Sequence, residues 1–298
     1  MRLLRAYAVG FALAASWAGG AAADTTTTNY QLMLQTRTDA NAPDEVFVAG
    51  YSSFANVVNN APSTSNYTQI GISPAYRIGG LTWDGSAYRL MLQTRVDANA
   101  PDEVFIASYA SEAALLANSP FVTNYSQIGI SPSYRVAGLT HDGTAYRLML
   151  QTRADDNAPD EIFIASYSSF ANLLSNSPFT SNYTQIGISP SYEVKDFTWD
   201  GSAYRLLLQT RTDANAPDEI FIASYGSFAN LLTNSPFTSD YTRIGISPSY
   251  EVVGFASVTT TIVDPPPPEV PEPASWALLV IGFGSTGIML RRRRVQAA

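Results

Sequence analysis

Hydrophobic and polar positions alternate over short stretches of this chain, and turn-forming residues separate the stretches. Segment 192–199 alternates well enough to predict a strand, and Asp200-Gly201 after it predicts a two-residue type I′ hairpin, because glycine tolerates positive φ. Segment 203–210 predicts the returning strand, with Tyr204, Leu206 and Leu208 on one face. These two strands form a predicted antiparallel pair.

The next stretch predicts two more strands. A polar loop, 211–218, leads into 219–225, whose apolar centre indicates a strand buried on both faces. Segment 227–232 predicts one helical turn or an irregular excursion. Segment 243–246 predicts a short fourth strand, which Pro248 ends.

This unit is repeated at a spacing of 58 residues, with copies that begin at Tyr30, Tyr88, Tyr146 and Tyr204. Repeats of this length bury their apolar faces against neighbouring copies. Four strands in a meander are typical of one blade of a β-propeller. The body is therefore an array of four similar units.

The ends of the array predict how it closes. The first copy lacks the first strand of the unit, and the last copy is followed by 250–255, which matches that missing strand. Pairing the two leaves no sheet incomplete. We expect an all-β fold, a four-bladed β-propeller closed by its N- and C-terminal strands. An open β-repeat array is the alternative.

Composition narrows the chemistry. The chain has no cysteine and a single histidine, His141, which stands where other copies have Trp83 and Trp199, so we interpret it as a substitution without catalytic meaning. The chain has 17 Lys and Arg and 25 Asp and Glu; outside segments 1–23 and 271–298 the counts are 11 and 24. This acidic body argues against nucleic acid and anionic membrane surfaces as partners.

The N-terminal segment, 1–23, has the order of a secretory signal peptide: two arginines, a short apolar run and a small-residue exit that ends at Ala23. The apolar run is too short for a membrane anchor. We expect cleavage after Ala23 and a propeller body over 24–258.

The C-terminal segment follows a proline-rich linker, 259–270. It contains Pro271, Glu272 and Pro273, an uncharged stretch over 274–290 long enough for a transmembrane helix, and four arginines that favour the cytoplasmic side: Arg291, Arg292, Arg293 and Arg294.

This tail, 271–298, resembles a PEP-CTERM sorting signal in the variant with Trp-Ala after the second proline. The resemblance implies a Gram-negative bacterium whose secretion machinery and exosortase handle the chain. It implies an inner-membrane-anchored precursor, inserted transiently through the C-terminal helix, and then a place at the cell surface or in the extracellular, biofilm-type matrix, with exopolysaccharide as a partner.

One repeated loop is the candidate ligand or calcium site. Its Asp-x-Asn spacing offers oxygen ligands to Ca²⁺, but it lacks the glycine and final glutamate of an EF-hand. The simpler interpretation is an Asx-turn closed by proline. The candidate residues are Asp39, Asn41, Asp44, Asp97, Asn99, Asp102, Asp155, Asn157, Asp160, Asp213, Asn215 and Asp218.

Aromatic residues form a second repeated set, represented by Tyr51, Tyr67, Tyr76 and Trp83. Their rings could stack on sugars, but we expect them to fill the spaces between blades.

The sequence favours a non-catalytic secreted protein of the envelope or exopolysaccharide matrix, which binds glycan or envelope components weakly at several repeated sites. A structural spacer without ligand and an extracellular glycosidase are the alternatives. A glycosidase needs two carboxylates in unlike surroundings. The acids that occur outside the repeat pattern form no motif: Glu112, Asp156, Glu193, Asp196 and Glu251.

Overall fold

The computed structural model describes most of the repeat array. Its contacts divide the chain into two units, 27–260 and the two ends together, 1–26 with 261–298. The sheets belong to the first unit, apart from the outer ends of two strands. The described residues are 24–36, 44–64, 68–73, 75–94, 102–122, 128–131, 133–152, 160–180, 186–189, 191–210, 218–237, 244–246 and 249–262.

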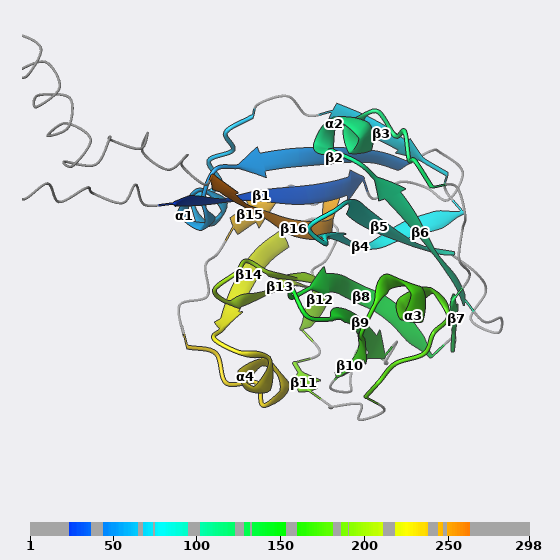
Figure 1. Cartoon of the computed structure of the whole chain (residues 1–298). Helices are drawn as coiled ribbons and strands as arrows, with labels where there is room; N and C mark the ends of the chain where they lie inside the picture. Colours follow the sequence, from blue (N-terminus) through cyan, green and yellow to red (C-terminus); the bar gives the residue numbers. More distant parts are fainter. Residues whose placement is uncertain are drawn as a thin grey trace, which may run out of the picture. The chain divides into compact units, whose positions relative to one another are not determined.

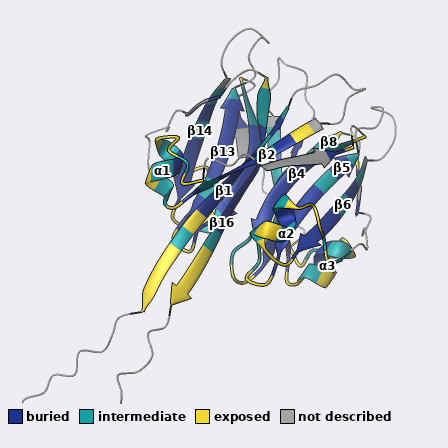
Figure 2. Cartoon of the chain, turned by 90° about the horizontal axis from the view of Figure 1, so that it is seen from above, coloured by how far each residue is buried: buried dark blue, intermediate teal, exposed yellow. Residues whose placement is uncertain are grey.

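The fold is all-β, as predicted, and consists of four antiparallel sheets of four strands (Figure 1). The first sheet has the order β16-β1-β2-β3, so the last strand of the chain lies beside the first, as the sequence predicts. Figure 2 shows β1 and β16 side by side, buried along the body and exposed at their outer ends. The strands are β16 (Tyr250–Ile262), β1 (Thr25–Thr36), β2 (Asp44–Tyr51) and β3 (Thr68–Ile72).

The other three sheets follow the chain in order, each with strands that pair with their sequence neighbours. The second sheet contains β4 (Tyr76–Trp83), β5 (Tyr88–Thr94), β6 (Asp102–Tyr109) and β7 (Ile128–Ile130). The third contains β8 (Tyr134–His141), β9 (Tyr146–Thr152), β10 (Asp160–Tyr167) and β11 (Ile186–Ile188). The fourth contains β12 (Tyr192–Trp199), β13 (Tyr204–Thr210), β14 (Asp218–Tyr225) and β15 (Ile244–Ile246).

A short helix follows the third strand of each repeat, where the sequence left a helical turn or an irregular excursion open. A serine before each helix accepts the N–H of its third residue, which caps the free end of the backbone. An asparagine with positive φ follows each helix, a conformation that its short polar side chain tolerates. The helices are α1 (Phe54–Val58), α2 (Glu112–Leu116), α3 (Phe170–Leu174) and α4 (Phe228–Leu232).

The hairpin after β12 differs from the predicted two-residue type I′ turn. Its last strand pair is Trp199 with Tyr204, so four residues form the connection, and only Gly201 among them has positive φ, at 90°. The reason is the Asp200 side chain, whose Oδ1 accepts the N–H groups of Ser202 and Ala203 at 2.9 and 2.8 Å. This Asx-type turn replaces the tighter one.

Four hydrophobic clusters form the core, and each lies between two sheets. One joins the first and second sheets, one the second and third, one the third and fourth, and one the fourth and first. Each cluster contains a fully buried side chain of a second strand, from the same position in every repeat: Met33, Met91, Met149 and Leu207. Each sheet therefore buries its faces against two others.

Candidate functional site

The predicted Asp/Asn loop lies mostly outside the described residues. Its last aspartates, Asp44, Asp102, Asp160 and Asp218, begin β2, β6, β10 and β14, and their backbones pair with Ile72, Ile130, Ile188 and Ile246. A threonine hydroxyl closes the base of each loop; the Thr36 Oγ1 accepts the Glu45 N–H at 3.0 Å. The remaining predicted loop residues, Asp39, Asn41, Asp97, Asn99, Asp155, Asn157, Asp213 and Asn215, lie outside the description, as do Ala23 and 271–298.

The middle of the body contains one buried carboxylate, Asp196. Its Oδ2 accepts the N–H groups of Leu81 on β4 (3.0 Å) and Phe255 on β16 (2.7 Å). Its Oδ1 accepts those of Leu139 on β8 (3.2 Å) and Phe197 on β12 (2.8 Å). One side chain therefore binds the first strand of every four-stranded unit.

Glycine surrounds Asp196 because only one side chain fits at this point. Gly80, Gly138 and Gly254 occupy the position of Asp196 in the other units. A Cβ added at Gly138 would lie 2.6 Å from the Asp196 Oδ1, and one at Gly80 would lie 2.8 Å from the Leu139 nitrogen. Burial raises the pKa of Asp196 well above its usual range, and the four N–H donors oppose that rise.

A cluster of unlike charges lies on the same inner strands. The Lys195 ammonium is 3.0 Å from the Glu193 Oε2 and 2.9 Å from the Glu251 Oε2. Arg135 forms an ion pair with Glu193 as well. Glu193 and Glu251, which form no motif in the sequence, therefore share one lysine, because β12 and β16 meet here although they are far apart in the chain.

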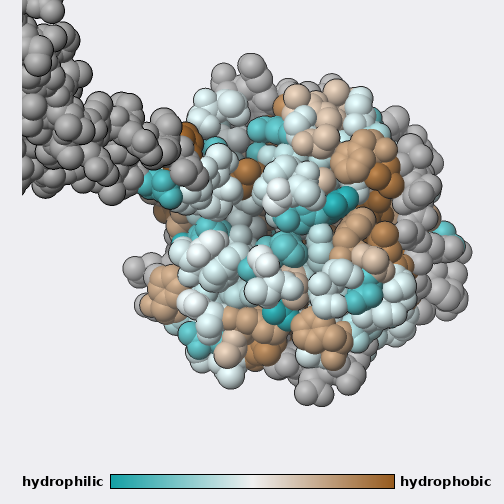
Figure 3. Space-filling model, viewed as in Figure 1, coloured by the Kyte–Doolittle hydropathy of each residue, from teal (hydrophilic) through white to brown (hydrophobic). Residues whose placement is uncertain are grey.

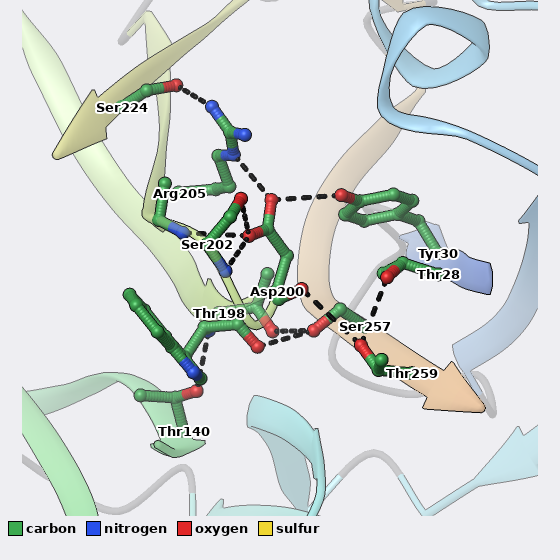
Figure 4. A network of polar contacts seen from close by, with 12 residues as sticks. Thr28, Tyr30, Thr140, Thr198, Asp200, Ser202, Arg205, Ser224, Ser257 and Thr259 are labelled. Carbon is green, nitrogen blue, oxygen red and sulfur yellow. Dashed lines mark hydrogen bonds and ion pairs between the residues drawn. The ribbon is translucent and has the colours of Figure 1, made fainter. Parts of the chain in front are cut away.

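At three junctions between neighbouring sheets, a network of polar contacts joins one sheet to the next. Figure 4 shows the network between the fourth and first sheets. Asp200 Oδ2 accepts a hydrogen bond from the Arg205 Nε (2.8 Å) and from the Tyr30 hydroxyl of the neighbouring sheet (2.9 Å). The Arg205 NH1 donates to the Ser224 Oγ at 2.6 Å, and the guanidinium lies 4.1 Å from the centre of the Phe54 ring. We call this arrangement the arginine latch.

The same latch occurs at two more junctions. Between the second and third sheets it consists of Asp84, Arg89, Ser108, Tyr146 and Phe170. Between the third and fourth it consists of Asp142, Arg147, Ser166, Tyr204 and Phe228. Each latch pairs a charged arginine with a buried carboxylate and leaves neither without a partner.

The latch controls the titration of its own groups. Burial alone would raise the pKa of Asp84, but hydrogen bonds from Tyr146, Ser86 and Arg89 outweigh burial and hold that pKa well below its usual range. Asp142 behaves in the same way. Burial and the neighbouring carboxylate raise the pKa values of Tyr146 and Tyr204. The latch therefore favours an ionised aspartate and a neutral tyrosine.

Two equivalent pockets lie at the junctions of the second with the third sheet and of the third with the fourth. The first has a volume of about 330 Å³ and the second about 250 Å³. In each, a half-buried tyrosine meets a phenylalanine edge to face, Tyr134 with Phe163 at 5.4 Å and Tyr192 with Phe221 at 5.3 Å. The polar atoms of these walls include the side chains of Ser131 and Asn176, and Ser189 and Asn234.

The predicted aromatic set packs within the body where it is described. Tyr51 is buried and donates to the Asn60 Oδ1 at 3.1 Å, and Tyr76 meets Phe105 edge to face at 5.7 Å. Trp83 lies 4.9 Å from Tyr88, ring centre to ring centre. Tyr67 lies outside the description. Tyr51 also belongs to the hydrophobic cluster between the fourth and first sheets, and Tyr76 and Trp83 pack against the cluster between the first and second.

His141 takes the structural place of the tryptophans. Its ring centre lies 4.6 Å from that of Tyr146, close to the 4.8 Å between Trp199 and Tyr204. Burial lowers the pKa of His141, against the pull of Asp84 and Asp142.

The body presents several separate hydrophobic patches on the face seen in Figure 3. Its most exposed large apolar side chains include Phe121, Phe179 and Phe237, each more than half exposed. In the part of the chain that the structure describes, no group of three or more metal-ligating side chains comes together, and no helix is long and apolar enough to cross a bilayer. The predicted membrane span, 274–290, lies outside that part.

A family comparison identifies the tail. The family described as the PEP-CTERM protein-sorting motif matches residues 269–294. Comparison with curated proteins gives no match. The motif implies export, anchoring in the membrane before processing, and processing there by exosortase. It agrees with the resemblance seen in the sequence and says nothing of what the repeats do.

Proposed function

We propose that the four sheets are the blades of a closed four-bladed β-propeller. Three features of the body support closure. The fourth hydrophobic cluster joins the last sheet to the first, Asp196 binds four inner strands, and a glutamine at each junction accepts a backbone N–H of the next sheet. The glutamine Oε1 atoms and the backbone N–H groups that donate to them are Gln35 with Ile78, Gln93 with Val136, Gln151 with Val194 and Gln209 with Val252.

The test of closure uses the absence of cysteine from the chain. The Oγ1 atoms of Thr28 on β1 and Thr259 on β16 lie 3.1 Å apart. A T28C/T259C variant should form one intramolecular disulfide on mild oxidation and unfold at a higher temperature, since the bond would close a loop of nearly the whole body. An open array predicts no intramolecular disulfide, and each single variant serves as the control.

We propose further that this propeller is a non-catalytic protein of the cell surface or exopolysaccharide matrix of a Gram-negative bacterium. Its sorting signal is of the variant with Trp-Ala after the second proline. The propeller binds glycan weakly at repeated sites. The observation that supports this most is the equivalent pocket at two successive junctions, each with an aromatic pair and polar side chains in its wall. Aromatic faces stack on sugar rings, and equal weak sites combine into avidity.

A glycan array with the purified full-length protein tests this binding, with calcium and with a chelator. Y134L and Y192L should each weaken binding to an immobilised polysaccharide. The double variant should weaken it more than either, because two sites act on one polymer. F121L changes an exposed ring outside both pockets and should bind as the wild type does.

The calcium arm separates two interpretations of the Asp/Asn loops. Binding lost in the chelator, together with heat on calcium titration, would support the loops as ligands of a hard cation. Equal binding in both arms would support the plain Asx-turn.

A structural spacer is the second candidate. It is supported by the many repeated side chains that have partners inside the molecule, namely those of the latches, the glutamines and the buried aromatic pairs. No binding to any immobilised polysaccharide, with the fold intact, would favour the spacer. Turnover of a polysaccharide would instead favour a glycosidase.

A further inference from the structure

The junction between the first and second sheets lacks the arginine latch. At the other three, an arginine on the second strand of one sheet lies over a phenylalanine of the next sheet's helix, with 4.0 to 4.1 Å between the guanidinium carbon and the ring centre. The first sheet has Gln31 at the position of that arginine, and α2 has Glu112 at the position of that phenylalanine. The partner position also changes, from serine to Gly50.

These changes occur together around one space. Ser63 stands where the other repeats have the exposed Phe121, Phe179 and Phe237, and two of those rings lie 5.9 Å from a latch guanidinium. The substitutions leave a pocket of about 260 Å³ whose wall includes Gln31, Gly50, Thr64, Tyr88 and Glu112. That volume is below the range of drug-sized ligands and suits a single functional group.

The wall of this pocket has an acceptor without a donor. Gln31 is only 3% exposed, and its Nε2 donates to the Tyr88 hydroxyl at 2.8 Å. Its Oε1 is a buried side-chain atom with no hydrogen-bond partner among the described residues. A buried acceptor in this state costs free energy until an N–H or O–H group reaches it.

A negative charge faces the same space. The Glu112 Oε1 lies 4.0 Å from the place of a Cβ at Gly50, the position from which serine in the latches binds the guanidinium NH1 at 2.6 Å. Burial raises the pKa of Tyr88 to about 12; the Gln31 hydrogen bond lowers it, and the nearby Glu112 charge raises it. Among the described residues of the pocket wall there is no lysine, arginine or histidine.

We propose that this pocket binds a guanidinium group, supplied either by free arginine or by an arginine side chain of a peptide. The N–H groups of a guanidinium satisfy the Gln31 Oε1, and its charge complements the Glu112 carboxylate. The molecule itself fills the corresponding space with a guanidinium at its three other junctions. The first junction differs in leaving that group to a ligand. This inference does not depend on glycan binding.

Calorimetry with the purified full-length protein at low ionic strength tests the proposal. The probes are L-arginine, the tripeptide Gly-Arg-Gly and L-citrulline, which keeps the shape of arginine without its charge. Arginine or the peptide should bind, and citrulline should bind at least about tenfold more weakly, because charge-assisted hydrogen bonds are lost. Binding of the peptide alone identifies a peptide source, and equal binding of both identifies the guanidinium group as sufficient.

Two variants complete the test. E112Q should weaken arginine binding by about 10- to 100-fold, whereas D24N, which removes the same charge at an exposed site, should leave it unchanged. Q31R supplies the guanidinium from the chain and should abolish binding without lowering the melting temperature. No heat with arginine or the peptide, equal affinity for citrulline, or unchanged affinity in folded E112Q or Q31R would overturn the proposal.

Discussion

The centre of the body and its junctions use the same repeat in opposite ways. At the junctions, a side chain can recur because each copy faces a different neighbour, and three arginine latches recur with nearly equal distances. At the centre all copies meet at one point, so one aspartate excludes any other side chain and glycine occupies three positions. Crowding therefore forces asymmetry at the centre. At the first junction the copies do not meet at one point, and the repeat is nevertheless broken at Gln31, Gly50, Ser63 and Glu112.

The largest expected effect concerns the centre. D196A removes the acceptor of four backbone N–H groups and should lower the free energy of unfolding by on the order of 4 kcal/mol. Urea unfolding followed by circular dichroism measures it. D196N, which keeps one of the two oxygens, should lose about half as much. A D196A variant within about 1 kcal/mol of the wild type would show that the central carboxylate does not hold the inner strands.

The next effect concerns a latch. R147Q gives the third junction the glutamine of the first and should cost about 2–3 kcal/mol, because Asp142 stays buried without its arginine. R147K keeps the charge but not the forked donors and should cost less. Urea unfolding again gives the values.

The pH dependence sharpens this test. The folded-state pKa of Asp142 lies below its unfolded value, so its contribution is fully present above about pH 4 and is lost as the pH falls through the folded value. R147Q should therefore lose less stability on acidification than the wild type. The hydrogen bonds from Thr144 and Tyr204 lower the same pKa and remain in R147Q, so equal acid sensitivity of the two proteins would show that Arg147 does not contribute to the low pKa of Asp142.

A smaller effect is expected at the charge cluster. K195M removes the ammonium between Glu193 and Glu251 and should cost about 1 kcal/mol, since both carboxylates remain partly solvated. In 1 M salt, where screening is strong, the cost should shrink further. A cost that does not depend on salt would assign the effect to packing of the lysine stem.

The repeat made much of this fold predictable. The strands of each unit, the all-β class and the pairing of the first and last strands follow from alternation and from the incomplete end copies. The prediction of a two-residue type I′ turn at Asp200 was wrong, because the Asp200 side chain accepts backbone N–H groups of the turn. The sequence alone marks Asp196 as unusual, since Gly80, Gly138 and Gly254 occupy its position in the other repeats. That these four positions meet at one point is known only from the structure.

The contacts between copies could not be predicted as well from the sequence. Asp200 and Arg205 are near neighbours in the chain, but Tyr30 reaches them from the other end of the body. Likewise, the exchanges at Gln31 and Glu112 are visible as departures from the repeat. That they face one pocket follows only from the stacking of the first sheet on the second.

The smallest expected effect lies at a position where the repeat changed without structural loss. H141W restores the residue of the second and fourth sheets, and a tryptophan there should stack on Tyr146 as Trp83 stacks on Tyr88. At pH 8 we expect a gain of about 0.5 kcal/mol in the free energy of unfolding, from the larger aromatic contact. Paired urea titrations of variant and wild type measure it.

Acid should widen that difference. Burial lowers the pKa of His141 below its ordinary value, so the unfolded chain binds a proton more readily than the folded one. The wild type therefore loses stability as the pH falls through about 6.5, and H141W, which has no group to titrate there, does not. H141F, with a smaller ring and no proton to bind, should share the pH profile of H141W but not its gain at pH 8. If all three proteins lose stability equally between pH 8 and pH 5, His141 is exposed to solvent and does not replace tryptophan in the packing of the third sheet.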